Sequence, residues 1–158
     1  MVYEGPDLPI VAKLLNLSAE EITQRYLVDK YLIPLPGDLG GLAYFKFRDN
    51  LFDLPRKKTL AFIPIDGVVD FAAGLGIAGS RAPKGMEGKR PSGWWMIGWT
   101  PIRKWLPDRD PPVLIKAGDW IRYKKNEADD FDRIAQEVDR GTYELKMMTE
   151  AQRLHLLL

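Results

Sequence analysis

The sequence predicts a mainly β domain, a sandwich or a barrel, preceded by a short helical hairpin and followed by one helix. Three observations support this fold class. Short apolar runs recur between residues 31 and 124, glycine and proline separate many of them, and clear helical periodicity is confined to the two ends of the chain. Many short strands divided by turn residues are typical of sandwiches and barrels. With 158 residues, the chain is long enough for one domain with a buried core.

Two short helices are predicted within Tyr3–Val28, because apolar residues recur there at helical spacing. Asp7 lies where it can cap the first helix. Ser18 and Glu21 then spell the S-x-x-E capping box that begins a second helix. Helices of this size are too short to be stable alone, so we expect the hairpin to pack on the residues that follow.

Seven short apolar runs are predicted to be strands of the β domain. They are Tyr31–Leu35, Leu42–Phe47, Leu60–Ile65, Val68–Ala72, Trp94–Trp99, Val113–Lys116 and Trp120–Lys124. The fifth run lies within Pro91–Pro101, a segment in which Gly93 and Gly98 bracket an aromatic-rich strand whose large side chains can anchor a core. Prolines exclude Leu106–Pro112 from a central strand, so this segment is predicted to be a loop.

A third helix is predicted to begin at Asn126, its cap, and to end at Gly141. Thr142–Met147 is a candidate for one more strand. The apolar tail Leu154–Leu158 has two interpretations, a segment laid on the β domain or a partner contact. We therefore divide the chain into a helical lead-in at residues 1–30, the β domain at 31–125, and a C-terminal helix and tail packed on it at 126–158.

Charge and residue usage exclude several kinds of site. The formal charge of +1 gives the chain no bias toward nucleic acid or acidic membranes. Cysteine is absent and His155 is the single histidine, which excludes disulfides, thiol nucleophiles and multi-histidine metal sites, so no metal is expected. No apolar run reaches the length of a membrane span and residues 1–9 lack a signal-peptide pattern, so we expect a cytoplasmic protein.

A glycine-rich segment and the cations beside it form a candidate binding loop. Gly74–Gly79 spells G-x-G-x-x-G, the dinucleotide fingerprint, but the residues after it are a poor start for a helix, so we interpret it as a flexible loop. Lys84, Lys89 and Arg90 lie beside it. Two interpretations are open, an anion-binding loop that closes over a phosphate or carboxylate and a solvated surface loop.

Three acids in apolar or glycine-rich surroundings are candidates for a general base: Asp38, Asp66 and Asp70. The alternative is that each is a turn acid that hydrogen-bonds its own backbone. We place Asp38 and Asp66 ahead of Asp70 as catalytic candidates. The five tryptophans are expected mainly in the core, although Trp95 and Trp99 would line a cleft if they point away from Trp94.

Several motifs along the chain resemble one known family. Gly5–Leu8 reads G-P-D-L, which is similar to the segment leading into the second half of allophanate hydrolase subunit 1. That family includes the KipI proteins and the B subunit of bacterial 5-oxoprolinase. Its later motifs are present in altered form at Gly37–Tyr44, Pro55-Arg56, Ile65–Gly74, Pro91–Pro101 and Ala117–Tyr123. Their order and spacing extend the resemblance over almost the whole chain.

The resemblance implies a fold, a partner and a function. It implies a cyclophilin-like barrel at residues 31–125, and a small α/β domain that usually precedes G-P-D-L is expected to be absent or encoded separately. It also implies a small component of an ATP-dependent amidohydrolase or carboxylase, with ATP bound by the complex. The partner would be a second carboxyltransferase-type protein, similar to KipA or to the C subunit of 5-oxoprolinase, and the two would share a cleft. The alternatives are a KipI-type regulator of a sensor kinase and a scaffold protein without catalysis.

The resemblance also implies substrate contacts. Tyr44, Arg56 and Thr100 keep the residue types of the family motifs and are expected to contact substrate. Trp99 stands where the family motif G-R-T-P has an arginine, and it is expected at the same site. Loss of that fixed cation implies either a less anionic substrate or a purely structural role for the chain.

Overall fold

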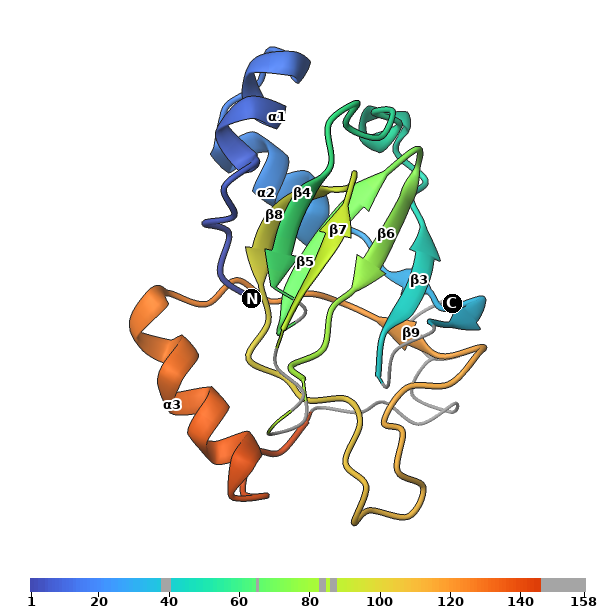
Figure 1. The fold of residues 1–158 in the computed structure, drawn as a ribbon, viewed down its shortest axis with the longest axis vertical. Coiled ribbons are helices and arrows are strands. Elements are labelled where there is room, and N and C mark those ends of the chain that lie inside the picture. Colours follow the sequence, from blue (N-terminus) through green and yellow to red (C-terminus); the bar gives the residue numbers. More distant parts are fainter. Residues whose placement is uncertain (38–40, 65, 83–84, 86–87, 146–158) are drawn as a thin grey trace.

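An antiparallel sheet of five strands lies at the centre of the fold (Figure 1). The computed structural model describes residues 1–37, 41–64, 66–82, 85 and 88–145. The strand order in this sheet is β2 (Leu35–Pro36), β3 (Ala43–Lys46), β6 (Leu75–Ala78), β5 (Val68–Ala72) and β8 (Trp95–Trp99). Every residue of β5 is buried, because side chains pack against both faces of the sheet at this strand.

Two smaller sheets and three helices accompany the central sheet in the described ranges. One sheet pairs β1 (Tyr31–Leu32) with β9 (Trp120–Ile121), and the other pairs β4 (Ala61–Pro64) with β7 (Lys89–Ser92). The helices are α1 (Leu8–Leu15), α2 (Ala19–Val28) and α3 (Ala128–Asp139), and Asn50–Phe52 form a 3-10 turn. The predicted order of helical hairpin, strands and final helix is confirmed.

The described strands do not close into one barrel. Their ladders are divided among three separate antiparallel sheets in the part of the chain that the structure describes. Prolines in or beside the short strands (Pro34, Pro36, Pro64 and Pro91) lack the backbone donor that a ladder needs. The expectation of a closed cyclophilin-like barrel is therefore corrected to antiparallel sheets with helices at both ends of the chain.

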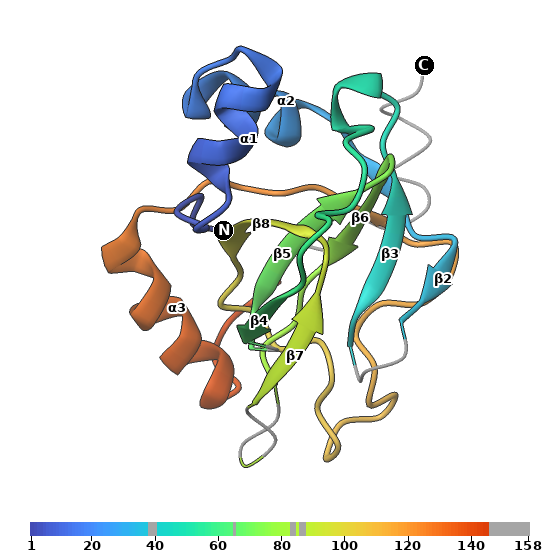
Figure 2. The ribbon, with the colours of Figure 1, turned by 45° about the horizontal axis from the view of Figure 1, so that its top comes forward.

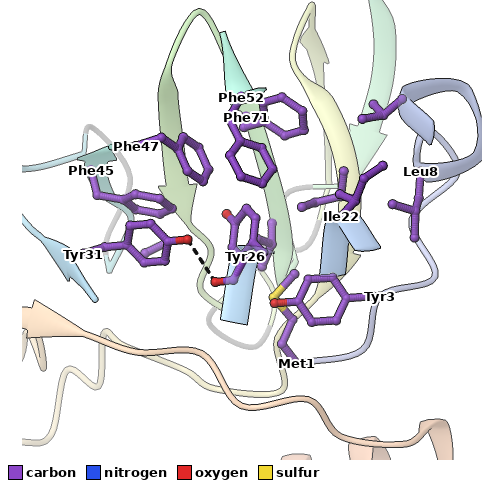
Figure 3. Close-up of a cluster of buried hydrophobic side chains, with 14 of the residues drawn as sticks. Met1, Tyr3, Leu8, Ile22, Tyr26, Tyr31, Phe45, Phe47, Phe52 and Phe71 are labelled. Carbon is purple, nitrogen blue, oxygen red and sulfur yellow. Dashed lines mark hydrogen bonds between the residues drawn. The ribbon is translucent and has the colours of Figure 1, made fainter. Parts of the chain in front are cut away.

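The main aromatic core lies between one face of the central sheet and α2 (Figure 3). Tyr26 of α2 is fully buried, and its ring centroid lies 5.3 Å from that of Phe47 and 5.5 Å from that of Phe52. Phe47 and Phe52 stack at 4.2 Å. The Tyr31 hydroxyl donates to the Tyr26 carbonyl at 2.9 Å. Each fully buried ring of this kind stabilises a fold by about 1.5–3 kcal/mol, which explains why the helical hairpin packs on the sheet.

The opposite face of the central sheet lies under the two strands β4 and β7, which cross in front of β5 (Figure 1, Figure 2). We call this two-stranded sheet the β4–β7 ribbon. Ile63 of β4 packs with Val68 of β5 and Met96 of β8. A second small cluster contains Ala72 at the other end of β5. Because side chains alternate along a strand, Asp70 lies on this face between the two apolar clusters.

The N-terminal residues form an added edge beside β8. Val2 and Trp99 exchange two backbone hydrogen bonds of 2.9 and 2.8 Å, and the Gly5 amide donates to the Ile97 carbonyl at 3.1 Å. This approach is so close that a Cβ at Gly5 or Gly98 would overlap backbone atoms of the facing segment. The second glycine of the predicted Pro91–Pro101 motif therefore has a packing role.

The capping box predicted for the second helix is confirmed, whereas the predicted cap of the first helix is not. The Ser18 hydroxyl accepts from the Glu21 amide at 3.1 Å, and the Glu21 carboxylate accepts from the Ser18 amide at 2.7 Å. Asp7 occupies the N-cap position of α1, but its side chain makes no capping hydrogen bond. It bonds instead to a lysine and to a backbone amide of β8, and charge-assisted bonds in a nearly dry site outweigh a cap.

Two strands form where the sequence predicted a flexible glycine-rich loop and its basic flank. Leu75–Ala78 is β6, which pairs with β3 on one side and β5 on the other. Gly76 has no Cβ and so leaves room for the ring of Phe45, which fills that space. Lys89–Ser92 is β7, paired with β4. Tertiary pairing thus overrides the weak local strand propensity of both segments.

The last turn of α3 is hydrogen-bonded to Arg81, which lies just after β6. Two nitrogens of the Arg81 guanidinium donate to the Asp139 carboxylate at 3.0 and 3.2 Å, and one donates to the Ala135 carbonyl at 3.2 Å. The helix ends before Gly141, whose φ is +71°, as predicted. Its N-cap is Glu127, one residue after the predicted cap Asn126.

Other predicted elements are shorter than expected or lie outside the described residues. Val113–Lys116 contributes a single bridge, between Val113 and Trp105. Thr142–Leu145 contains no strand, and the rest of that candidate, like the tail with His155, lies outside the described residues. The three-part division of the chain remains a prediction.

Candidate functional site

Charged side chains collect near the sheet face that the β4–β7 ribbon covers. The Asp7 carboxylate accepts from the Met96 backbone amide at 2.8 Å and from the Lys57 ammonium at 2.6 Å. The side chains of Asp7 and Lys57 are only 12% and 13% exposed. Lys57 also lies over the ring of Trp95 at 5.7 Å. These bonds hold the start of α1, the segment before β4 and strand β8 at one point.

Asp70 is the most deeply buried acid of this group, with no exposed surface. A guanidinium nitrogen of Arg90 lies 3.9 Å from its carboxylate, which is too far for a hydrogen bond. In the described part of the chain, neither carboxylate oxygen of Asp70 nor Nε of Arg90 has a hydrogen-bond partner. A buried carboxylate without such partners is costly to keep charged.

Burial therefore raises the pKa of Asp70 to about 7, although the charges of Arg90 and Lys57 oppose the shift. The nearby carboxylate of Asp7 adds to it. A carboxyl group that titrates near neutral pH has the property required of a general acid or base. The ribbon covers Asp70, however, so in this conformation the carboxyl group is out of contact with solvent.

A second group of side chains surrounds Trp94 and connects two of the predicted substrate contacts. The Arg56 guanidinium carbon lies 5.4 Å from the Trp94 ring centroid, and the Tyr44 ring lies 6.1 Å from it. Arg56 is exposed and Tyr44 is half-buried. A guanidinium that rests on an aromatic face is held in place while its donors stay available. We call Tyr44, Arg56 and Trp94 the Trp94 platform.

The other two predicted substrate contacts lie at the far end of β8, roughly 16 Å along the strand from the Trp94 platform. Trp99 is half-buried against the Ile63 cluster. Thr100 is 6% exposed, and its hydroxyl accepts from the Ile102 amide at 3.3 Å. The structure thus places Tyr44 and Arg56 each beside the Trp94 ring but does not bring Trp99 or Thr100 to that ring.

The catalytic candidates and the predicted anion-binding loop are only partly described. The Asp66 carboxylate accepts from the Ala82 amide at 2.6 Å, a bond to backbone 16 residues away and not the local turn bond considered as the alternative. Lys89 and Arg90 are neighbours on β7, so they point to opposite faces, with Lys89 exposed and Arg90 turned toward Asp70. Asp38 and Lys84 lie outside the described residues.

Lys104 is a buried cation that the sequence did not single out. It is 7% exposed, and its ammonium donates to the Ala78 carbonyl at 3.0 Å and also to the Gly79 carbonyl. Burial lowers the pKa of Lys104 to about 7. The two carbonyls offset part of the cost of burial, and they join the end of β6 to the segment after β8. We assign Lys104 a structural role.

Of the groups now visible, Asp70 had the clearest sequence signal. It is the one acid in Val68–Ala72, a run otherwise made of apolar residues. Lys57 and Lys104 lie in basic or mixed segments where nothing local marks them as buried. Within the described ranges no cluster of His, Asp or Glu side chains is suited to a metal ion. No helix in those ranges is long and apolar enough to span a membrane.

Comparisons with known proteins give the relatives of this chain. Residues 1–115 match the family described as carboxyltransferase domain, subdomain C and D. The B subunit of 5-oxoprolinase from Bacillus subtilis (strain 168) is 30% identical over 133 residues, which are 84% of this chain and 52% of that protein. The chain spans about half the length of the curated relatives it matches.

Solved structures agree with this relationship. A conserved uncharacterized protein from Pyrococcus horikoshii is 25% identical with a TM-score of 0.71, and the match covers 82% of this chain and 58% of that one. The Kluyveromyces lactis urea carboxylase shares the fold with a TM-score of 0.69 at 16% identity, over 87% of this chain and 12% of that one. The family match covers more than half of the residues, and the chain therefore belongs to the carboxyltransferase subdomain C and D family.

Proposed function

We propose that this chain is one component of an ATP-dependent enzyme complex in the cytoplasm that acts on a lactam, ureido or related carbonyl compound. It forms one wall of a cleft, and a second carboxyltransferase-type protein, similar to KipA or to the C subunit of 5-oxoprolinase, forms the other. The similarity to the 5-oxoprolinase B subunit over 84% of the chain supports this assignment. Activation of the carbonyl by phosphate or by a carboxyl carrier takes place in the complex.

The observation that carries the proposal is the Trp94 platform. Arg56 and Tyr44 come from different segments of the chain, and both lie at the same indole ring. Both side chains carry hydrogen-bond donors. Together they are suited to bind and polarise the carbonyl oxygen of an amide or ureido group. This chain then contributes binding and polarisation to the shared cleft.

Replacing Arg56 by alanine should lower the kcat/KM of the reconstituted complex at least tenfold, a loss of about 1.4 kcal/mol of transition-state stabilisation. The stability of the chain should change by less than about 1 kcal/mol, since an exposed cation–π contact contributes no more than that. Steady-state kinetics of the complex and thermal unfolding of the isolated chain measure the two effects.

The matched control is Arg122→Ala, which removes an arginine that is also exposed and lies outside the platform. It should leave the kinetics unchanged. An Arg56→Lys variant keeps the charge but not the planar fork, and it should recover only part of the activity. Unchanged kinetics in Arg56→Ala would remove Arg56 from the site.

A further inference from the structure

The outer face of the β4–β7 ribbon is apolar, although it is turned away from the sheet. Ile63 and its partner Arg90 face inward, so the neighbouring pair, Phe62 and Pro91, faces outward. Phe62 is 73% exposed, and Leu60, two residues earlier on the chain, is 62% exposed. Large apolar side chains grouped on one exposed face are typical of an interaction site.

Cations border this apolar face, and no acid lies within the two segments that form it. Residues 54–64 and 88–93 contain five lysines and arginines and no aspartate or glutamate, in a chain whose net charge is +1. Lys57 and Arg90 are turned inward, to Asp7 and Asp70. Lys58 and Lys89 are exposed, so they supply positive charge at the rim.

We propose that the outer face of the β4–β7 ribbon, with Leu60, Phe62 and Pro91 at its centre and Lys58 and Lys89 at its rim, is the docking surface for the second protein of the complex. The complementary surface of that partner is an apolar patch bordered by carboxylates. The identity of the partner protein rests on the proposed function. The location of the surface rests on exposure and charge alone.

The distribution of charge favours a protein partner. A nucleic-acid interface places cations across its whole width, because each phosphate must be neutralised. Here the centre is apolar and the cations lie at the edge, which is the usual anatomy of a protein interface with a hydrophobic core and a polar rim. The rim charges then act mainly on association rate and specificity.

The test is binding of this chain to the protein from the same source that corresponds to the C subunit of 5-oxoprolinase, measured by isothermal titration calorimetry. Phe62→Ser and Leu60→Ser should each weaken binding at least about tenfold, since both remove a central apolar contact. The matched controls are Val28→Ser and Leu14→Ser, which remove apolar side chains that are 74% and 56% exposed on the helices. They should bind like the wild type. Circular dichroism checks that every variant is folded.

A charge-reversal pair tests the rim. Lys58→Glu with Lys89→Glu should slow association and reverse its dependence on ionic strength, because the two rims would then repel each other, whereas Lys13→Glu with Lys46→Glu, at exposed lysines elsewhere, should change neither. If the wild-type chain fails to bind the partner, the proposed function is overturned. If it binds and Phe62→Ser binds equally well, only the docking surface is overturned. A wild-type dimer that Phe62→Ser converts to a monomer would identify a second copy as the occupant and would also overturn it.

Discussion

Replacing Gly79 by alanine should destabilise the fold by about 3 kcal/mol or more, because the new Cβ has no space. At this position a Cβ would overlap the carbonyl carbon and oxygen of Val68. These are backbone atoms of a strand, so they cannot move aside as a flexible side chain can. Gly79 follows β6 and is buried, and its own carbonyl accepts from Lys104. The midpoint of thermal unfolding should fall by roughly 10 °C, as measured by circular dichroism or calorimetry.

Gly93→Ala is the control for that experiment. A Cβ at Gly93 would lie 3.3 Å from the Lys57 carbonyl oxygen and 3.4 Å from a methyl carbon of Leu60. Small movements relieve contacts of this length, so the loss should be about 1 kcal/mol or less. Equal losses in the two variants would show that close backbone approach is not what requires glycine at position 79.

Replacing Asp70 by asparagine should stabilise the chain at pH 8 by on the order of 3 kcal/mol and have little effect at pH 3.5. Burial raises the pKa of Asp70 to about 7 in the folded chain, whereas an unfolded aspartate titrates near about 3.9. The folded chain therefore binds this proton more tightly than the unfolded chain does. Its free energy of unfolding falls as pH rises from about 4 to about 7, and asparagine removes that dependence.

Urea unfolding from pH 3.5 to pH 8 measures the free energy of unfolding of the wild type and of Asp70→Asn. The difference between the two values at each pH removes the contribution of other titrating groups, because both proteins share those groups. Asp108→Asn, at an exposed loop position, is the control and should differ from the wild type by less than about 0.5 kcal/mol throughout. A difference between Asp70→Asn and the wild type that stays constant with pH would mean that the pKa of Asp70 is the same in the folded and the unfolded chain, which contradicts the prediction.

Local signals predicted the helices and most of the strands. The Ser18–Glu21 capping box lies where the sequence indicates it, since its partners are three residues apart. The apolar runs at Val68–Ala72 and Trp94–Trp99 contain strands β5 and β8 because β-branched and aromatic residues suit a buried sheet. These predictions needed only neighbours along the chain.

The features that the sequence did not predict depend on residues far apart along the chain. Asp7 is a plausible cap by position, but its partner amide belongs to Met96, 89 residues away. The local sequence predicts a flexible segment at Leu75–Ala78. It forms a strand because β3 and β5 pair with it on both sides. Of the predicted substrate contacts, Tyr44 and Arg56 are connected only through the Trp94 ring, which each of them contacts. Spacing along the chain contains none of this information.

The N-terminal segment beside β8 also affects how the protein behaves in concentrated solution. An uncovered sheet edge is a template for strand addition, and therefore for aggregation. Bonds from Val2, Gly5 and Asp7 occupy backbone groups of Trp99, Ile97 and Met96 along that edge. The apolar strand of the Pro91–Pro101 motif is thus shielded from other copies of the chain. Residues 2–7 therefore protect this edge from pairing with strands of other copies of the chain, and this role does not depend on any substrate.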